Sequence, residues 1–160
     1  RSPWEARGAR NDEYVAAMRA LWREPHVEFH GKYVDFDKVT CSPRPVNGSI
    51  PVIVGGDTDA ALRRAARHAD GYFPGEGDPK KLAELIGCLH AEAEKIGRDP
   101  AEIKINIMFG AQMADPAAGI AELKALGVDR IMVPAFFFAG EDGLERLQKF
   151  GETIIPMAGD

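Results

Sequence analysis

The feature that most constrains the fold is a regular alternation of strand-like and helix-like segments between Pro51 and Ile155. Four short segments with strand character each precede a helix-like segment: Pro51–Gly55, Gly71–Phe73, Ile103–Met108 and Arg130–Pro134. Such alternation is typical of parallel strands joined by crossover helices. Four βα units are also half of a (β/α)8 barrel. The alternation therefore predicts an α/β fold with parallel strands, and a partial (β/α)8 TIM barrel is an arrangement that fits the count.

Capping signals mark where the helices of this segment begin. Asp57 or Thr58 precedes a helix expected over 59–69, and Asp78-Pro79 and Asp115-Pro116 each combine an N-cap residue with proline at the first helical position. A fourth helix is expected over 142–153. The helical periodicity predicts inward-facing side chains on the first two helices: Leu62, Ala65, Ala66, Ala69, Leu82, Leu85, Ile86, Leu89, Ala93 and Ile96.

The first 50 residues follow a different pattern. Asn11 is a candidate cap of a helix that continues to Trp22 and is ended by Pro25. A small β-hairpin is expected over 27–36, and residues 40–51 are expected to form a loop. We therefore expect one domain over residues 1–160, in which 1–50 hold a helix plus a hairpin and 51–160 hold four βα units.

Composition excludes several classes of protein. The formal net charge of −5 over 160 residues argues against a nucleic-acid-binding surface, which needs a basic face. No apolar run approaches the roughly 20 residues of a membrane helix, and the polar start does not resemble a signal peptide. Cys41 and Cys88 lack metal-binding spacing and are expected to be reduced thiols, as in a cytoplasmic protein. The chain starts at Arg1 rather than at methionine, which suggests a fragment, a processed product or an incomplete version of a longer chain.

The histidines and paired carboxylates do not predict a metal site. His26 and His30 are four residues apart, but Pro25 and Gly31 argue against a helix that would bring them together. Asp35 and Asp37 would share one face of a strand, where exposure to solvent explains them better than catalysis. We therefore predict no metal.

The most informative local motif is the glycine turn Gly55-Gly56-Asp57-Thr58, which ends a strand and opens a helix. Glycines allow close backbone approach to a ligand and positive φ, and N–H groups at the start of a helix favour a phosphate. A tight turn that needs glycine for steric reasons alone is the competing interpretation. A second glycine-containing turn, within 71–77, follows the next strand and would lie at the same rim.

The order and spacing of several short motifs resemble the bacterial luciferase-like monooxygenase superfamily. The resemblance is strongest to the C-terminal half of its deazaflavin (F-420)-dependent oxidoreductase branch and covers nearly the whole chain. Its motifs are Arg7-Gly-Ala-Arg10 with Glu13, Leu21-Trp22, Phe29-His-Gly-Lys-Tyr33, Pro43-Arg-Pro45, Pro51-Val-Ile-Val-Gly-Gly56, Arg63-Arg-Ala-Ala66, Ala69-Asp-Gly-Tyr-Phe-Pro74, Gly97-Arg-Asp-Pro100 and Leu126-Gly-Val-Asp-Arg130.

The resemblance implies a flavin- or deazaflavin-dependent oxidoreductase or monooxygenase acting on a small-molecule substrate. The four βα units would be the last four of the barrel, and the hairpin would belong to an insertion before its fifth strand. The implied cofactor is the 8-hydroxy-5-deazaflavin coenzyme (F-420), with FMN as the alternative. Carried over by position, its phosphate would lie at Gly55, Gly56, Asp57, Thr58, Gly71 and Tyr72. No residue matches the family's usual catalytic groups, which lie in the first half of the barrel, so the catalytic residues stay unknown.

Two other interpretations stay open. The chain could be a non-catalytic half barrel that forms a homo-oligomer or complements a missing N-terminal half barrel, because free strand edges favour pairing. An open flavodoxin-like sheet is less favoured, since that fold usually has five strands. The run Phe136-Phe137-Phe138 follows the last strand and could line a ligand pocket, plug the barrel or form an interface.

Overall fold

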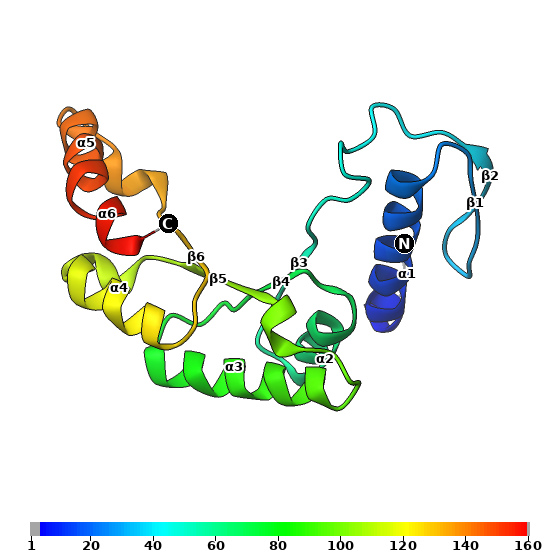
Figure 1. Cartoon of the computed structure of the whole chain (residues 1–160), viewed down its shortest axis with the longest axis horizontal. Helices are drawn as coiled ribbons and strands as arrows, with labels where there is room; N and C mark the ends of the chain where they lie inside the picture. Colours follow the sequence, from blue (N-terminus) through cyan, green and yellow to red (C-terminus); the bar gives the residue numbers. More distant parts are fainter. Residues whose placement is uncertain (1–3, 160) are drawn as a thin grey trace. The chain divides into compact units, whose positions relative to one another are not determined.

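The computed structural model describes residues 4–159, which fall into two compact units (Figure 1). Unit 1 ends at Val52 and unit 2 begins at Ile53. This division lies close to the boundary between residues 50 and 51 that the sequence predicts between the hairpin region and the βα units. That both units belong to one domain stays a prediction.

Unit 1 begins with a long helix. A short 3-10 helix, η1 (Trp4–Ala6), leads into α1 (Arg7–Arg23). Asn11 therefore lies inside α1, and the expectation that it caps the helix is wrong. The preceding Arg-Gly-Ala-Arg segment contains no proline, and its alanine and arginines favour continued helix. The end is as predicted: Glu24 is extended, as residues before a proline generally are.

A two-stranded antiparallel hairpin completes unit 1, which confirms the second prediction for this region. Strand β1 (Val27–His30) pairs with β2 (Asp35–Val39). The Glu13 carboxylate of α1 accepts hydrogen bonds from the backbone N–H groups of Tyr33 (2.6 Å) and Val34 (2.7 Å). Burial acts to raise the pKa of Glu13, but these bonds, a third from the Lys32 N–H and the charge of Lys32 outweigh it and lower the pKa. An ionised Glu13 thus ties the helix to the hairpin turn.

Unit 2 is built on a four-stranded parallel sheet with the strand order β3-β4-β5-β6. Its strands are β3 (Ile53–Gly55), β4 (Gly71–Phe73), β5 (Lys104–Met108) and β6 (Arg130–Met132). The parallel order confirms the prediction from the βα alternation. Strand β3 starts two residues later than expected, at Ile53, and proline at position 51 has no N–H for a sheet ladder.

Helices follow each strand, and most begin at the predicted caps. They are α2 (Asp59–His68), α3 (Pro79–Glu94), α4 (Pro116–Ala125), α5 (Gly143–Thr153) and the short α6 (Ile155–Ala158). Short 3-10 helices are η2 (Pro100–Glu102), η3 (Ala111–Ala114) and η4 (Ala135–Phe138). Asp78 and Asp115 accept hydrogen bonds from the N–H groups of Lys81 and Ala118, as capping requires.

One face of the sheet forms the core of unit 2. Val54, Tyr72, Ile105 and Ile107 alternate along the strands and pack with the buried faces of the helices. The predicted inward residues of α2 and α3 are buried or partly buried, with one exception. Ile96 is 48% exposed, because α3 ends at Glu94 and the helical periodicity no longer applies beyond it.

The other face of the sheet is largely open. Ile53, Met108 and Met132 on this face are 43%, 47% and 39% exposed. The register also places the exposed Lys104 and Arg130 on this face. Parallel sheets are normally covered on both faces, so a largely open face is unusual for such a sheet and is what half of a barrel would show. In residues 4–159, none of the helices combines the length and apolar character needed to cross a membrane.

Candidate functional site

The glycine turn lies where β3 ends and α2 begins. Gly56 has φ +111°, a conformation that side chains other than glycine rarely adopt, and an added Cβ would lie 3.3 Å from the Ala61 Cβ. Its N–H donates to the Phe73 carbonyl at 3.3 Å, and its own carbonyl accepts from the Tyr72 hydroxyl at 3.1 Å. The N–H of Gly56 is therefore already used within the fold and is not open to a phosphate, contrary to the prediction that the amides of this turn are free.

The start of α2 provides the remaining donors. Thr58 is the N-cap, and its hydroxyl accepts from the Ala61 N–H at 3.3 Å. This settles the alternative between Asp57 and Thr58 in favour of Thr58. Asp59 and Ala60 are the first two helical residues, and N–H groups at those positions have no acceptor within a helix. Both residues are exposed. An anion at this turn would thus meet the first turn of α2.

Asp57 connects the two glycine-containing turns. Its Oδ1 accepts a hydrogen bond from the Gly75 N–H at 2.8 Å. An added Cβ at Gly75 would lie 3.0 Å from Asp57 Oδ2, so the glycine leaves room for the carboxylate. The turns after β3 and β4 are neighbours, as the sequence predicts. The same contact places a negative charge in the turn, which weakens its attraction for a phosphate.

The packing of unit 2 itself explains why a tyrosine stands at position 72 and a glycine at position 71. Tyr72 is fully buried, and burial raises the pKa of its phenol, followed by the effect of the neighbouring Asp57. The protonated hydroxyl can therefore donate to Gly56 at neutral pH. An added Cβ at Gly71 would lie 2.8 Å from Asn106 Nδ2 and 2.9 Å from the Lys104 carbonyl oxygen. That these two residues bind a cofactor stays a prediction.

The loop after β4 satisfies its own amides. Glu76 accepts hydrogen bonds from the N–H groups of Gly77 and Asp78, both at 2.9 Å, and from Lys81 Nζ at 3.3 Å. The bond from Asp78, followed by those from Lys81 and Gly77, lowers the pKa of Glu76. The carboxylate occupies donors that an anionic ligand would otherwise use. Glu76 lies within the glycine-containing turn 71–77, but the glycine spacing gives no sign that this side chain accepts from the amides of its own loop.

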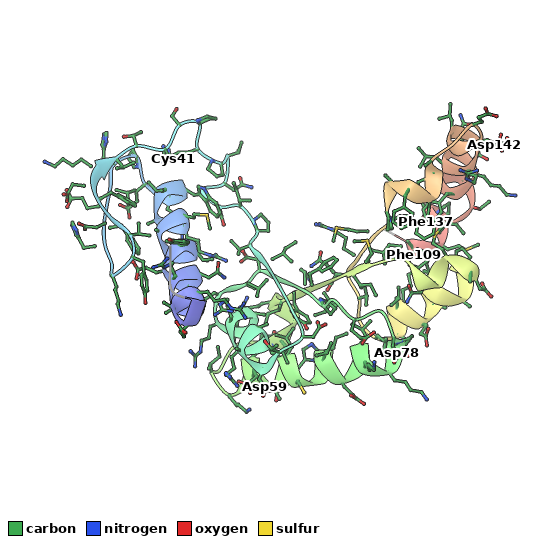
Figure 2. The ribbon with its side chains drawn as sticks, turned by 180° about the vertical axis from the view of Figure 1, so that it is seen from behind. Cys41, Asp59, Asp78, Phe109, Phe137 and Asp142 are labelled. Carbon is green, nitrogen blue, oxygen red and sulfur yellow. The ribbon has the colours of Figure 1, made fainter. Side chains whose placement is uncertain are left out.

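The three phenylalanines after β6 differ in exposure. Phe136 is 71% exposed, and its ring centroid lies 4.6 Å from that of Phe137. Phe138 packs edge-to-face against Phe150 of α5 at 5.5 Å. Figure 2 labels Phe137 on the segment that leads into this helix. Phe138 is thus part of the packing of α5, and Phe136 presents its ring to solvent.

The hairpin of unit 1 brings together a histidine and carboxylates for which the sequence predicts no metal site. His30 Nδ1 lies 2.7 Å from Asp35 Oδ1, and Nε2 lies 3.4 Å from Asp37 Oδ1. Potential ligand atoms of Glu28, His30 and Asp37 lie within 4.8 Å of one another, and all three side chains are exposed. The hydrogen bond to Asp35 raises the pKa of His30; partial desolvation acts to lower it, and the charges of Asp37, Asp35 and Glu28 raise it further. The surrounding carboxylates therefore favour protonation of His30.

A buried glutamine in unit 2 was also missed. Gln112 of η3 is 8% exposed, and its Nε2 donates to the Gly77 carbonyl at 3.2 Å. Its Oε1 has no hydrogen-bond partner among the described residues. An isolated glutamine between Ala111 and Met113 gives no periodic signal of burial, so sequence reasoning had nothing with which to find it.

Comparisons with known proteins agree with the fold. The family model described as luciferase-like monooxygenase matches residues 1–147. A Mycobacterium tuberculosis (strain ATCC 25618 / H37Rv) protein named "Uncharacterized protein Rv0940c" is 39% identical over 162 residues, covering 96% of this chain and 54% of the relative. The FMNH(2)-dependent dimethylsulfone monooxygenase of Pseudomonas putida is 28% identical over 99 residues, covering 59% of this chain and 27% of that enzyme.

A solved structure shows the same fold at low identity. An F420-dependent secondary alcohol dehydrogenase, solved in complex with an F420-acetone adduct, superposes with a TM-score of 0.75 at 18% identity. The match covers 100% of this chain and 64% of the dehydrogenase. The chain therefore spans about half the length of the curated relative that it matches over 162 residues, and somewhat less than two thirds of this structural neighbour.

Proposed function

Since the chain belongs to the luciferase-like monooxygenase family, we propose that it forms the coenzyme-phosphate side of a flavin- or deazaflavin-dependent oxidoreductase barrel. The observation that carries the proposal is the turn at the end of β3. Gly55 and Gly56 end a parallel strand, Gly56 has φ +111°, and a helix capped by Thr58 begins directly after them. Ligands of α/β folds bind beyond the carboxyl ends of the strands, where this turn lies.

The donors that this turn offers to a phosphate are the backbone N–H groups at the start of α2. The N–H groups of Asp59 and Ala60 lack helical acceptors, and the helix dipole adds about +0.5 charge there. The carboxylate of Asp57 opposes the phosphate; its Oδ1 accepts a hydrogen bond from the Gly75 N–H, which fixes the position of the carboxylate but does not remove its charge. When bound, the coenzyme supplies the redox chemistry, and the role of this chain is to hold and orient it. The relatives use both F420 and FMN, and F-420 is our first choice.

Binding measurements with and without the phosphate test this role. We expect FMN to bind more tightly than riboflavin, and F-420 more tightly than its phosphate-free deazaflavin core, by a factor of roughly five, equivalent to about 1 kcal/mol. Thr58→Asp should abolish this preference, because aspartate still caps α2 but adds a negative charge beside the anion. Thr58→Ser keeps a neutral cap and should retain it. Fluorescence titration of each variant supplies the dissociation constants.

Two results would contradict the proposed phosphate site. One is equal affinity for FMN and riboflavin in the unaltered chain. The other is a preference for the phosphate form that survives Thr58→Asp, which would place the phosphate away from the start of α2. Circular dichroism of both Thr58 variants should first show unchanged helix content.

A second candidate role is favoured by the open face of the unit 2 sheet. Both β3 and β6 are edge strands, and Ile53, Met108 and Met132 expose apolar surface between them. We propose that this sheet associates with a second copy or with an N-terminal half barrel, since burying such surface is favourable. Light scattering of the isolated chain at high concentration should show a species larger than a monomer. A monodisperse monomer that still binds coenzyme would count against self-association.

A further inference from the structure

One face of the unit 1 hairpin carries a histidine and three carboxylates, the hairpin cluster. Glu28 and His30 lie two residues apart on β1, and Asp35 and Asp37 lie two residues apart on β2 (Figure 1). Side chains two residues apart on a strand point to the same face. His30 pairs with Asp35 in the hairpin register, so all four side chains share one face.

A β-bulge brings Asp37 opposite Glu28. The residue pairs on either side of Glu28 are separated by one residue on β1 but by two on β2, which are Asp37 and Lys38. Lys38 has φ +51°, in the left-handed region where one residue of a bulge is often found. On the opposite face the rings of Phe29 and Phe36 stack with their centroids 6.0 Å apart. The strands are thus held together by packing that needs no ion.

The imidazole of His30 is held in the tautomer that a metal ion requires. Nδ1 lies 2.7 Å from Asp35 Oδ1, and Nδ1 is the donor because an ionised carboxylate only accepts. In the neutral ring, Nε2 then carries the lone pair that binds a metal. Metal-binding histidines usually donate their other ring N–H to such a partner. Asp35 is therefore placed to orient the ligand rather than to be one.

The remaining distances suit a small divalent ion. Nε2 of His30 lies 3.4 Å from Asp37 Oδ1, and ligand atoms of Glu28, His30 and Asp37 all lie within 4.8 Å of one another. Two atoms that each lie about 2.1 Å from one zinc ion can be at most about 4.2 Å apart, so side-chain displacements below about 1 Å complete the geometry. Three protein ligands leave a further position for water.

The ligand atoms are accessible, and their chemistry is selective. The side chains of His30 and Asp37 are 61% and 73% exposed, and Glu28 is also exposed, so an ion can enter from solvent. Two ionised carboxylates match the charge of a divalent ion. The imidazole distinguishes this face from an ordinary acidic surface, because oxygen ligands alone suit Ca²⁺ and Mg²⁺, whereas imidazole suits Zn²⁺.

We propose that the hairpin cluster binds a divalent transition-metal ion, with Zn²⁺ as the probe, through His30 Nε2, Glu28 and Asp37, while Asp35 positions the imidazole. The sequence predicts no metal because His26 and His30 cannot share a helix face. The hairpin instead brings His30 to the carboxylates of the facing strand, a pairing that depends on strand register. This inference does not rest on the proposed oxidoreductase function, because the whole cluster lies in unit 1.

The test is a titration of the 15N-labelled chain with zinc chloride, followed by calorimetry and by long-range 1H–15N spectra of the histidine rings. It is done at about pH 8, since metal ligands must be deprotonated. We expect saturable binding with a dissociation constant on the order of ten micromolar and a coordination shift at His30 Nε2 rather than Nδ1. Calcium chloride is the comparison and should bind at least about tenfold more weakly, because it gains little from imidazole.

Three variants locate the ion. His30→Ala should abolish saturable binding. Asp35→Asn should weaken it roughly tenfold, as loss of a supporting carboxylate does, and should increase the share of the Nε2-protonated ring in the metal-free chain. His26→Ala is the matched control and should leave binding unchanged: His26 is exposed beside the same hairpin, but its Nδ1 lies 3.1 Å from the Thr40 hydroxyl, outside the cluster.

Zinc binding that is lost in His30→Ala and kept in His26→Ala supports the proposal. Absence of saturable binding, equal affinity for zinc and calcium, coordination through Nδ1, or binding that survives His30→Ala overturns it. Unchanged affinity and tautomer ratio in Asp35→Asn would overturn the positioning role of Asp35. If circular dichroism shows that His30→Ala does not fold, the zinc–calcium comparison and the ring-nitrogen signals of the unaltered chain still decide.

Discussion

Replacing Arg98 with alanine is expected to destabilise unit 2 by about 3 kcal/mol. The guanidinium donates to the carbonyl oxygens of Ala66 (2.9 Å) and Ala69 (2.7 Å) and lies 3.5 Å from that of Ala65. These groups are at the C-terminal end of α2, where the Ala65 carbonyl already accepts from the Ala69 N–H but the carbonyls after it lie beyond the reach of helical donors. Each hydrogen bond to a charged group contributes about 1.5–3 kcal/mol, and three that share one side chain do not add fully.

The measurement is urea denaturation followed by far-UV circular dichroism, together with hydrogen exchange of the α2 amides. Arg98→Lys should recover only part of the loss, because an ammonium cannot place donors on carbonyls that a planar guanidinium spans. Glu102→Gln is the control: Glu102 pairs with Arg98 Nε at 3.2 Å, but its side chain is 63% exposed, so its loss should cost under about 1 kcal/mol. A loss for Glu102→Gln equal to that for Arg98→Ala would show that the ion pair, not the carbonyl contacts, matters.

Arg98 also shows what the sequence could and could not reveal. Asp78-Pro79 and Asp115-Pro116 predict helix starts because capping depends on adjacent residues, and both are confirmed. The parallel sheet is predicted because the βα rhythm leaves few topologies. Arg98 contacts carbonyls about 30 positions earlier in the chain, and no local pattern encodes such a partner. Its place in the Gly97-Arg98-Asp99-Pro100 motif marked it by resemblance only.

The candidate site was predicted less completely than the fold. Residues 55–58 form a turn at the strand end, and the neighbouring turn lies beside it, as expected. The sequence could not show that the Gly56 N–H is used by Phe73, because that bond depends on the register between β3 and β4. Nor could it show that the Glu76 carboxylate accepts hydrogen bonds from the backbone N–H groups of the next loop. A glycine-rich stretch predicts backbone freedom but does not say which donors stay free.

Two different explanations account for glycine at position 71. The family resemblance implies that Gly71 contacts the coenzyme, whereas the structure shows that a side chain there would collide with the neighbouring strand. The Asn106 amide, itself 2% exposed, donates to the Lys104 carbonyl at 2.8 Å and lies across the position of the missing Cβ. Both obstacles belong to β5, the strand that pairs with β4. Gly71 therefore allows the two strands to pair while Asn106 is buried between them.

Gly71→Ala is accordingly expected to destabilise unit 2 by about 2–3 kcal/mol, because overpacking a buried site forces the backbone to shift. The Cβ would lie 2.9 Å from a backbone oxygen, which a rotamer change cannot relieve. Gly87→Ala is the matched control with the opposite sign. Gly87 is exposed within α3 and has no atom within 4 Å of its added Cβ, so alanine should stabilise the helix by about 0.5–1 kcal/mol.

Urea denaturation of the two alanine variants provides the comparison, and coenzyme titration of the same proteins adds a second readout. If Gly71 acts only through strand packing, the added Asn106→Ala substitution should recover part of the stability lost in Gly71→Ala, since it removes one of the two obstacles. Stability unchanged by Gly71→Ala would refute the steric explanation. If Gly71→Ala left stability unchanged but weakened FMN binding, Gly71 would act by contacting the coenzyme, as the family resemblance implies.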